Sequence, residues 1–272
     1  MRKLFIITGV WLVFFMILNL SLSAQLTEKE IEERPQWEKF LADAAVLKGS
    51  QPLPKALAVS RPHKLRLGKD GVERWGWWKN VTGRPEGYSD EWRREVAAYE
   101  LDKLLGLNMI PPTVEKRYRE DRGAISLQAE GTLYRELKAQ KTSLPSDAAQ
   151  RASFYKALFL RRTWDNLLHN KDRNEGDMIV TDDWRMYLID HSRAFSSSKD
   201  LFHKPKKGSG REPIRSLPTG FVENLAALDY DSIKDTVGDY LTKKEIERLL
   251  VRRDKILEEV ERLKVKIPDF LY

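Results

Sequence analysis

The sequence predicts an α+β protein of two lobes, with a strand-rich N-lobe over residues 61–140 and a helical C-lobe over residues 141–272. The first half contains short runs of β-forming residues bounded by polar turns, a pattern that favours strands. The second half spaces its apolar residues at helical intervals. A short hairpin pattern that carries several carboxylates lies where the helical half begins. A chain of 272 residues is long enough to bury a full core.

The composition is typical of an ordered globular protein, since 41% of the residues are hydrophobic and 33% are charged. The net charge of +7 favours an anionic partner, such as a nucleotide, a phospholipid or an acidic protein, but selects none of them. We find no DNA- or RNA-binding motif and expect no nucleic-acid partner. The absence of cysteine excludes disulfides, cysteine-ligated zinc and a thiol nucleophile.

Residues 1–24 have the pattern of a signal peptide or an N-terminal membrane anchor. Arg2 and Lys3 precede an uncharged apolar run over residues 4–24, which ends in small residues. The run is long enough to stay in a bilayer, which takes about 20 residues. With both basic residues in the cytoplasm, the rest of the chain is exported, to a periplasm, the cell exterior or a secretory lumen.

Residues 25–60 are expected to form a polar connector with a short helix. Two strands are expected on either side of the Lys69-Asp70-Gly71 turn. The helix that follows is expected to end at Gly106. Its apolar positions are Trp92, Val96, Tyr99 and Leu104. Two further strands joined by a polar turn are expected over residues 108–131, which completes the N-lobe.

The C-lobe is expected to begin with a long helix over residues 148–170, followed by the hairpin. The polar loop over residues 196–220 has no core pattern. Its basic residues are Lys204, Lys206 and Lys207, which either recruit an acidic substrate or form a solvated segment. The last helix is expected to start at Thr242, where Glu245 can complete a capping box.

The hairpin gathers three carboxylates whose spacing suggests different tasks. Asp172 lies in a loop directly after the long helix, where it can accept a proton. Asp177 opens the first strand and Asp190 closes the second, so the hairpin brings them together. Hard oxygen ligands of this kind suit Mg²⁺ or Mn²⁺. A turn role for Asp172, and an ion pair of Asp190 with Arg193, remain equally open from the residues alone.

A cation with an acidic partner can be assigned upstream of the hairpin. Lys79 ends an aromatic strand, and Glu95 falls early on the next helix. A strand lysine held by a helix glutamate can bind the phosphates of a nucleotide. Other pairings remain open: the competing lysines are Lys64 and Lys69, the competing glutamates are Glu91 and Glu100, and a surface salt bridge is the simplest interpretation.

The stretches "HNKDRNEGD" and "LIDHSRAF" resemble motifs of the protein-kinase-like superfamily. They are similar to the secretory-pathway kinases of the Golgi casein kinase and four-jointed group, which carry an Asn-x-Asp-Arg catalytic loop and an Asp-Asn-Gly-Arg-Gly-Phe metal motif. The bacterial Hip-type kinases and the phosphoinositide kinases are similar too. "REVAAYELDKLLGLNMIPPTV" resembles the helix and strand of the same group, so the resemblance covers roughly residues 60–200.

The resemblance implies a bilobal protein-kinase-like fold and a role for each candidate residue. Lys79 would contact the phosphates of ATP, and Glu95 would orient Lys79 or reach a metal ion. Asp172 would be the catalytic base. Asp190 would be the principal metal ligand, with Asp177 beside it where protein kinases have Asn, so that Mg²⁺ or Mn²⁺ would bind. The function implied is an exported phosphotransferase that moves the ATP γ-phosphate to a protein or other hydroxyl acceptor.

Three departures from the family pattern leave alternatives open. Asn80 follows Lys79 where the group has Pro, and the metal motif is changed at His191 and Ser192. The first strand pair carries the single Gly68 instead of a glycine-rich loop. The alternatives are a non-catalytic kinase-like binding module and an AMP transferase on the same fold.

Overall fold

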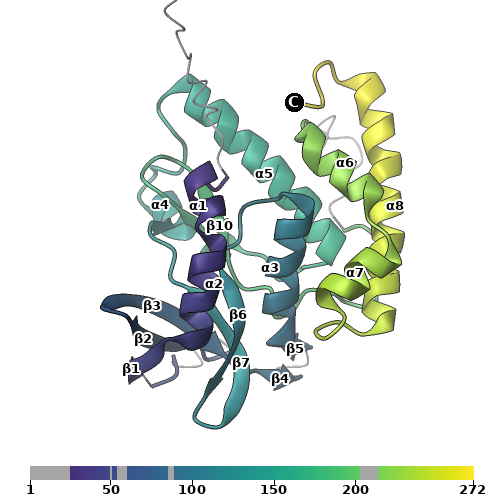
Figure 1. Cartoon of the computed structure of the whole chain (residues 1–272). Coiled ribbons are helices and arrows are strands. Elements are labelled where there is room, and N and C mark those ends of the chain that lie inside the picture. The colour runs from purple at the N-terminus through teal and green to yellow at the C-terminus, as the bar shows by residue number, and fades with distance from the viewer. Residues whose placement is uncertain (1–24, 50, 54–59, 85–88, 203–213) are drawn as a thin grey trace, which may run out of the picture.

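The strand-rich part of the computed structural model is a five-stranded antiparallel sheet of order β1-β2-β3-β7-β6 (Figure 1). Its strands are β1 (Ala45–Gly49), β2 (His63–Lys69), β3 (Val72–Lys79), β6 (Thr113–Tyr118) and β7 (Asp121–Leu127). The structure describes residues 25–49, 51–53, 60–84, 89–202 and 214–272. The expected signal segment and the lysines of the 203–213 stretch therefore lie outside the described residues.

The β2–β3 turn fixes which way the candidate lysine points. Asp70 and Gly71 both have positive φ, at 50° and 77°, as a two-residue hairpin turn requires. The turn pairs Lys69 with Val72 and Trp78 with His63 across β2 and β3, and on its other side β3 pairs Trp78 with Ile125 and Lys79 with Ala124 of β7. Because neighbouring strand residues point to opposite faces, Trp78 enters one core while Lys79 points to the other face.

Helix α2 (Arg34–Asp43) covers the Trp78 face of the sheet with Phe40 and Leu41. The sequence predicted only a short helix over residues 25–60, whereas the structure has α1 (Glu28–Glu32), α2 and the edge strand β1. Four of the five β1 residues are exposed, so the strand lacks the alternation that predicts one.

A buried ion pair ties α2 to the end of α3 (Arg93–Leu105). Arg34 Nη2 lies 2.5 Å from Asp102 Oδ2, and the two side chains are 4% and 0% exposed. The other Asp102 oxygen accepts the backbone N–H groups of Met109 and Ile110, at 2.8 and 3.1 Å. The pair therefore fixes the turn that leads from α3 into β6.

Helix α3 ends at Gly106 as expected, with φ of 64° at its C-cap. Val96 and Tyr99 are buried, but Leu104, which fits the same helical period, is 36% exposed and takes no place in the core. Leu101 and Leu105 take that place, because they follow Ala97 and Ala98 around the helix onto the face that meets the helical part.

The helical part consists of α5 (Ala148–Leu168), α6 (Thr219–Ala227), α7 (Tyr230–Val237) and α8 (Lys243–Lys266), which lie together in Figure 1. They share one core with the buried face of α3. The capping box predicted at Thr242 and Glu245 is confirmed. The predicted α+β class, with a sheet-rich part and a helical part, is confirmed.

The carboxylate hairpin is a small sheet of order β10-β9-β8, with β8 (Thr132–Leu133), β9 (Met178–Val180) and β10 (Met186–Leu188). Helix α4 (Tyr134–Ala139) follows β8, and the short 3-10 helix η2 (Glu175–Asp177) precedes β9. A two-residue ladder joins β4 (Thr82–Gly83) to β5 (Asp90–Glu91) before α3. Within the described ranges, no helix is both long and apolar enough to cross a bilayer.

The first prediction concerns the Arg34–Asp102 pair. Replacing Asp102 with Ala leaves a buried guanidinium and two backbone N–H groups without their acceptor, so we expect a loss of about 3–5 kcal/mol in the free energy of unfolding. Urea denaturation measures this loss. The control is Glu115→Ala, which breaks the more exposed Arg122–Glu115 pair and should cost about 1 kcal/mol or less. Equal losses for the two variants would contradict the assigned role of the buried pair.

Candidate active site

Lys79 lies between two carboxylates that come from different elements. Its Nζ is 2.7 Å from Glu95 Oε1 on α3 and 2.9 Å from Asp190 Oδ1, two residues beyond β10. The Lys79 and Glu95 side chains are only 12% and 7% exposed, whereas the Asp190 side chain is 38% exposed. Asp190 therefore keeps an accessible side while it holds the lysine.

The charges of this group stabilise one another. Burial alone would lower the pKa of Lys79, but the carboxylates of Asp190 and Glu95 raise it well above its usual range. Burial alone would likewise raise the pKa of Asp190, but the charge of Lys79 and hydrogen bonds from Lys79 and Ser192 lower it to about 2. At neutral pH the lysine is therefore a cation and Asp190 an anion.

Asp190 adopts a left-handed backbone conformation, with φ of 60°. This conformation is uncommon for a residue other than glycine and is held by its surroundings. Asn170 Nδ2 donates to the Asp190 carbonyl at 3.3 Å, and the next N–H, of His191, donates to Glu95 Oε2 at 2.9 Å. Glu95 thus binds the lysine with one oxygen and the backbone N–H of His191 with the other.

The altered residues of the metal motif are each anchored. The His191 ring is buried, and burial together with the charge of Arg173 keeps its pKa well below the usual range. Its Nε2 is 2.8 Å from Arg173 Nη2 and 3.4 Å from Trp164 Nε1. Ser192 Oγ lies 2.6 Å from Asp90 Oδ1 and 3.0 Å from Asp190 Oδ1.

Arg173 holds the two ends of the hairpin together. Its guanidinium donates to the backbone carbonyls of Asp177 and Ile189, which stand at the start and the end of the hairpin. Its Nε lies 3.1 Å from Asp165 Oδ1 on α5, and both side chains are nearly inaccessible. The hairpin ends are therefore fixed to the long helix by a buried ion pair.

Asp177 lies beside Asp190, as the hairpin pattern predicts. Burial and then the negative charge of Asp190 raise the pKa of Asp177 to about 7. Its Oδ2 accepts the backbone N–H and the side-chain amide of Asn174, at 2.9 and 2.6 Å. The two carboxylates thus repel each other at a place where a cation would relieve the repulsion.

Asp172 does not touch Lys79, Glu95 or Asp190 directly. Its side chain is 53% exposed, and its Oδ2 lies 3.0 Å from Arg193 Nη1. Arg193 Nε in turn lies 2.9 Å from Asp90 Oδ2, whose side chain is 1% exposed. Asp90 therefore connects both acidic parts of the site, through Ser192 to Asp190 and through Arg193 to Asp172.

The donor set near Asp190 fits a divalent cation. The oxygens of Asp177 and Asp190 are hard donors of the kind that Mg²⁺ and Mn²⁺ prefer. The Asn170 side chain is fully buried, and its amide oxygen has no hydrogen-bond partner within the described part of the chain. Among the described residues, no group of three or more His, Cys, Asp or Glu side chains gathers as a metal site. The candidate metal site therefore consists of two carboxylates, those of Asp177 and Asp190.

The structure brings together Lys79, Glu95 and Asp190, places Asp177 within electrostatic reach of Asp190, and leaves Asp172 on an outer edge. Sequence reasoning missed Asp90, because an Asp just before a helix is ordinarily a capping residue. Arg193 was considered only as a partner of Asp190, whereas it bridges Asp90 and Asp172. The small strand β5 places Asp90 beside the metal motif, and a two-residue strand leaves no sequence pattern.

Comparison with known proteins supports the fold. No family model matches the chain, and no curated protein matches it in sequence. Among solved structures it is similar to hydra Fam20, in a structure described as containing sugar, with a TM-score of 0.62 and 13% sequence identity. The match covers 92% of this chain and 95% of that one. The likeness shows a kinase-like fold in which a sheet-rich part is followed by a helical part.

The second prediction concerns the stability of the Asp177→Asn variant. The pKa of Asp177 is raised from 3.8 to about 7, so the folded chain binds a proton that the unfolded chain has already released. This residue therefore reduces the stability of the wild type as pH rises from about 4 to about 7. Relative to wild type, Asp177→Asn should gain stability over that range, by at most about 4 kcal/mol at pH 8.

Urea denaturation at several pH values in the presence of EDTA measures this difference. The matched control is Asp235→Asn, since Asp235 is exposed on α7. If the gain in unfolding free energy for Asp177→Asn were the same at every pH, the pKa of Asp177 would be equal in the folded and unfolded chain. That result would contradict the prediction.

Proposed function

We propose that the chain is a metal-dependent kinase-like phosphotransferase that moves the γ-phosphate of ATP to a hydroxyl acceptor. The observation that carries this proposal is the position of Lys79, buried between Glu95 and Asp190. A lysine in an ordinary surface salt bridge is exposed to solvent, whereas the Lys79 side chain is only 12% exposed and has two carboxylate partners. The kinase-like fold and the neighbouring Asp177 support the same reading.

In this proposal Lys79 binds phosphate oxygens of the nucleotide, and Glu95 holds its ammonium group in place. Asp190 and Asp177 hold Mg²⁺ or Mn²⁺, which supplies charge neutralisation for the phosphates when bound. Asp172 accepts the proton of the acceptor hydroxyl. The oxygen of that hydroxyl bonds to the γ-phosphorus, the bond to the β-phosphate oxygen breaks, and ADP leaves.

The resemblance to the Golgi casein kinase and four-jointed group, together with the signal-like residues 1–24, supports export and a protein acceptor. The group also tolerates an acidic residue at the Asp177 position, which is consistent with a preference for Mn²⁺. The acceptor hydroxyl would approach from the side of Asp172, because that carboxylate is the exposed one.

A non-catalytic binding module is the second candidate, and one observation favours it. The Asp172 carboxylate is already ion-paired with Arg193, which is itself held by the buried Asp90. A structural ion pair that takes no part in proton transfer would make the same contacts. AMP transfer would use the same lysine and carboxylates, so only the product distinguishes it.

The third prediction is that the full-length chain consumes ATP in the presence of Mg²⁺ or Mn²⁺. We expect Asp190→Ala to abolish turnover, and Asp172→Ala to lower it by about 10²–10⁴-fold, the usual contribution of a general base. The assay is release of ADP with a generic protein acceptor. Asp235→Ala on the exposed face of α7 is the control and should retain full activity. Turnover that survives both site variants would overturn the residue assignment.

The fourth prediction separates the alternatives. A kinase should be stabilised by ATP only when Mg²⁺ or Mn²⁺ is present, and Asp190→Asn should remove that metal-dependent rise in melting temperature. ATP binding without metal and without turnover would identify a binding module. Mass analysis of a modified acceptor completes the test, since a gain of AMP in place of phosphate would refute phosphotransfer.

A further inference from the structure

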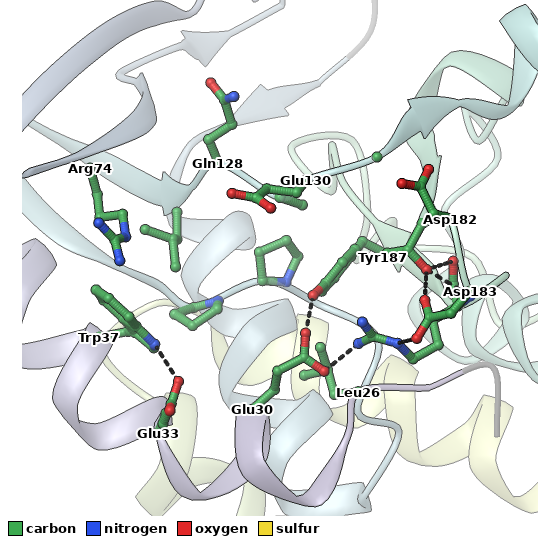
Figure 2. A pocket seen from close by; sticks show the side chains of 17 residues that line it. Leu26, Glu30, Glu33, Trp37, Arg74, Gln128, Glu130, Asp182, Asp183 and Tyr187 are labelled. Carbon is green, nitrogen blue, oxygen red and sulfur yellow. Dashed lines mark hydrogen bonds and ion pairs between the residues drawn. The ribbon is translucent and has the colours of Figure 1, made fainter. Parts of the chain in front are cut away.

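A cavity of about 460 Å³ lies apart from the candidate active site and includes none of the five predicted site residues in its lining (Figure 2). Its walls come from α1 and α2, the start of β3, the segment before β6, the β7–β8 connection and the β9–β10 turn. The cavity thus touches both the sheet and the hairpin. Its size falls in the range of pockets that bind small groups or side chains.

The floor of the cavity is apolar and rigid. The residues that form it are Leu26, Trp37, Pro111, Pro112 and Leu127. Proline rings and the Trp37 indole offer flat surfaces on which an aliphatic chain or a planar cation can lie. Trp37 already accepts such a contact, since the Arg74 guanidinium lies 5.0 Å from the centroid of its ring.

The rim of the cavity is acidic. Its carboxylates are Glu30, Glu33, Glu130, Asp182 and Asp183, and its cations are Arg74 and Arg185. The formal charge of the rim is therefore negative, although the whole chain carries +7. The cavity is therefore a locally negative region on a chain of positive net charge, and its field attracts cationic groups.

The two rim cations are already engaged. Arg185 forms ion pairs with both Glu30 and Asp183, and Tyr187 Oη donates to Glu30 at 2.5 Å (Figure 2). Burial alone would raise the pKa of Glu30, but hydrogen bonds from Arg185, Tyr187 and Thr27 lower it to about 2. This network fixes one wall and leaves an excess of negative charge in it.

Two carboxylates remain available to a ligand. Glu130 and Asp182 are both exposed, and within the described part of the chain neither has an ion-pair partner. They come from the β7–β8 connection and from the hairpin turn, so they lie on different walls of the cavity (Figure 2). A cation that contacts both therefore bridges the two walls.

We propose that this cavity binds an arginine or lysine side chain from a basic segment of a partner protein. The aliphatic stem of such a side chain packs on the two prolines and Trp37, and its charged head lies among the rim carboxylates, of which Glu130 and Asp182 have no other ion pair among the described residues. A nucleotide or an acidic peptide does not fit, because its negative charge would face the five rim carboxylates. This binding requires no phosphotransfer and is independent of the function proposed above.

The fifth prediction uses the full-length chain and a short fluorescein-labelled peptide of alternating arginine and alanine. Fluorescence anisotropy should show binding that weakens as salt is raised to about 0.15 M and above. The double variant Glu130→Gln with Asp182→Asn should weaken binding by about threefold to thirtyfold, from two lost charge pairs near the surface. The matched control, Glu223→Gln with Asp235→Asn on α6 and α7, loses the same charge away from the cavity and should bind as wild type.

Each other outcome overturns the proposal. A peptide with citrulline in place of arginine should bind much more weakly, and equal binding would show that positive charge is not recognised. Equal losses for the double variant and its control would assign the effect to net charge alone. Sedimentation tests for a second copy of the chain as the occupant: if the double variant reduces self-association and leaves peptide binding intact, the cavity is a self-association site.

Discussion

The buried charge of Lys79 is the constraint on which the candidate active site depends. A lysine with so little exposure is stable in this place only with carboxylates beside it, because an unpaired buried cation is very costly. One carboxylate comes from α3 and the other from the end of β10. The pairing therefore fixes the helix and the hairpin to the same end of β3, the central strand of the sheet. One electrostatic requirement thus joins a strand, a helix and the hairpin at the candidate site.

The residues that depart from the usual metal motif preserve this arrangement. The conformation at Asp190 strains a non-glycine backbone, and the structure holds it by contacts on both sides. His191 fills a buried space between Trp164 and Arg173 as a neutral ring, and Ser192 bridges Asp90 and Asp190. At the position where the usual motif has glycine, this chain has Ser192, whose hydroxyl is hydrogen-bonded to Asp90 and Asp190. With these contacts in place, the Asp190 carboxylate stays beside Lys79.

Much of this could be predicted from sequence where a local pattern exists. The Asp70-Gly71 turn sets the register of β3, and hairpin geometry places Asp177 near Asp190. The order of Lys79, Glu95 and the hairpin along the chain predicted that Lys79 pairs with Glu95. Contacts between distant segments leave no such pattern. Arg34 meets Asp102 only because α2 folds back over the sheet, and Asp90 meets Arg193 only because β5 is paired and short. Leu104 satisfied the helical period but lies at the margin of the buried face, where period alone does not decide exposure.

The β9–β10 hairpin connects two charged regions: the candidate active site, which contains Lys79, and the acidic cavity. At one end Asp177 and Asp190 stand beside a lysine, and at the other the turn carries Asp182 and Asp183 beside the acidic cavity. Strand β10 is shared between them: Leu188 faces the core, while Tyr187 reaches out to Glu30 on α1. Strand β10 ends two residues before Asp190, and its Tyr187 is one of the residues that line the cavity. Through the hydrogen bond between Tyr187 and Glu30, helix α1 thus contacts the same three-residue strand that leads to Asp190.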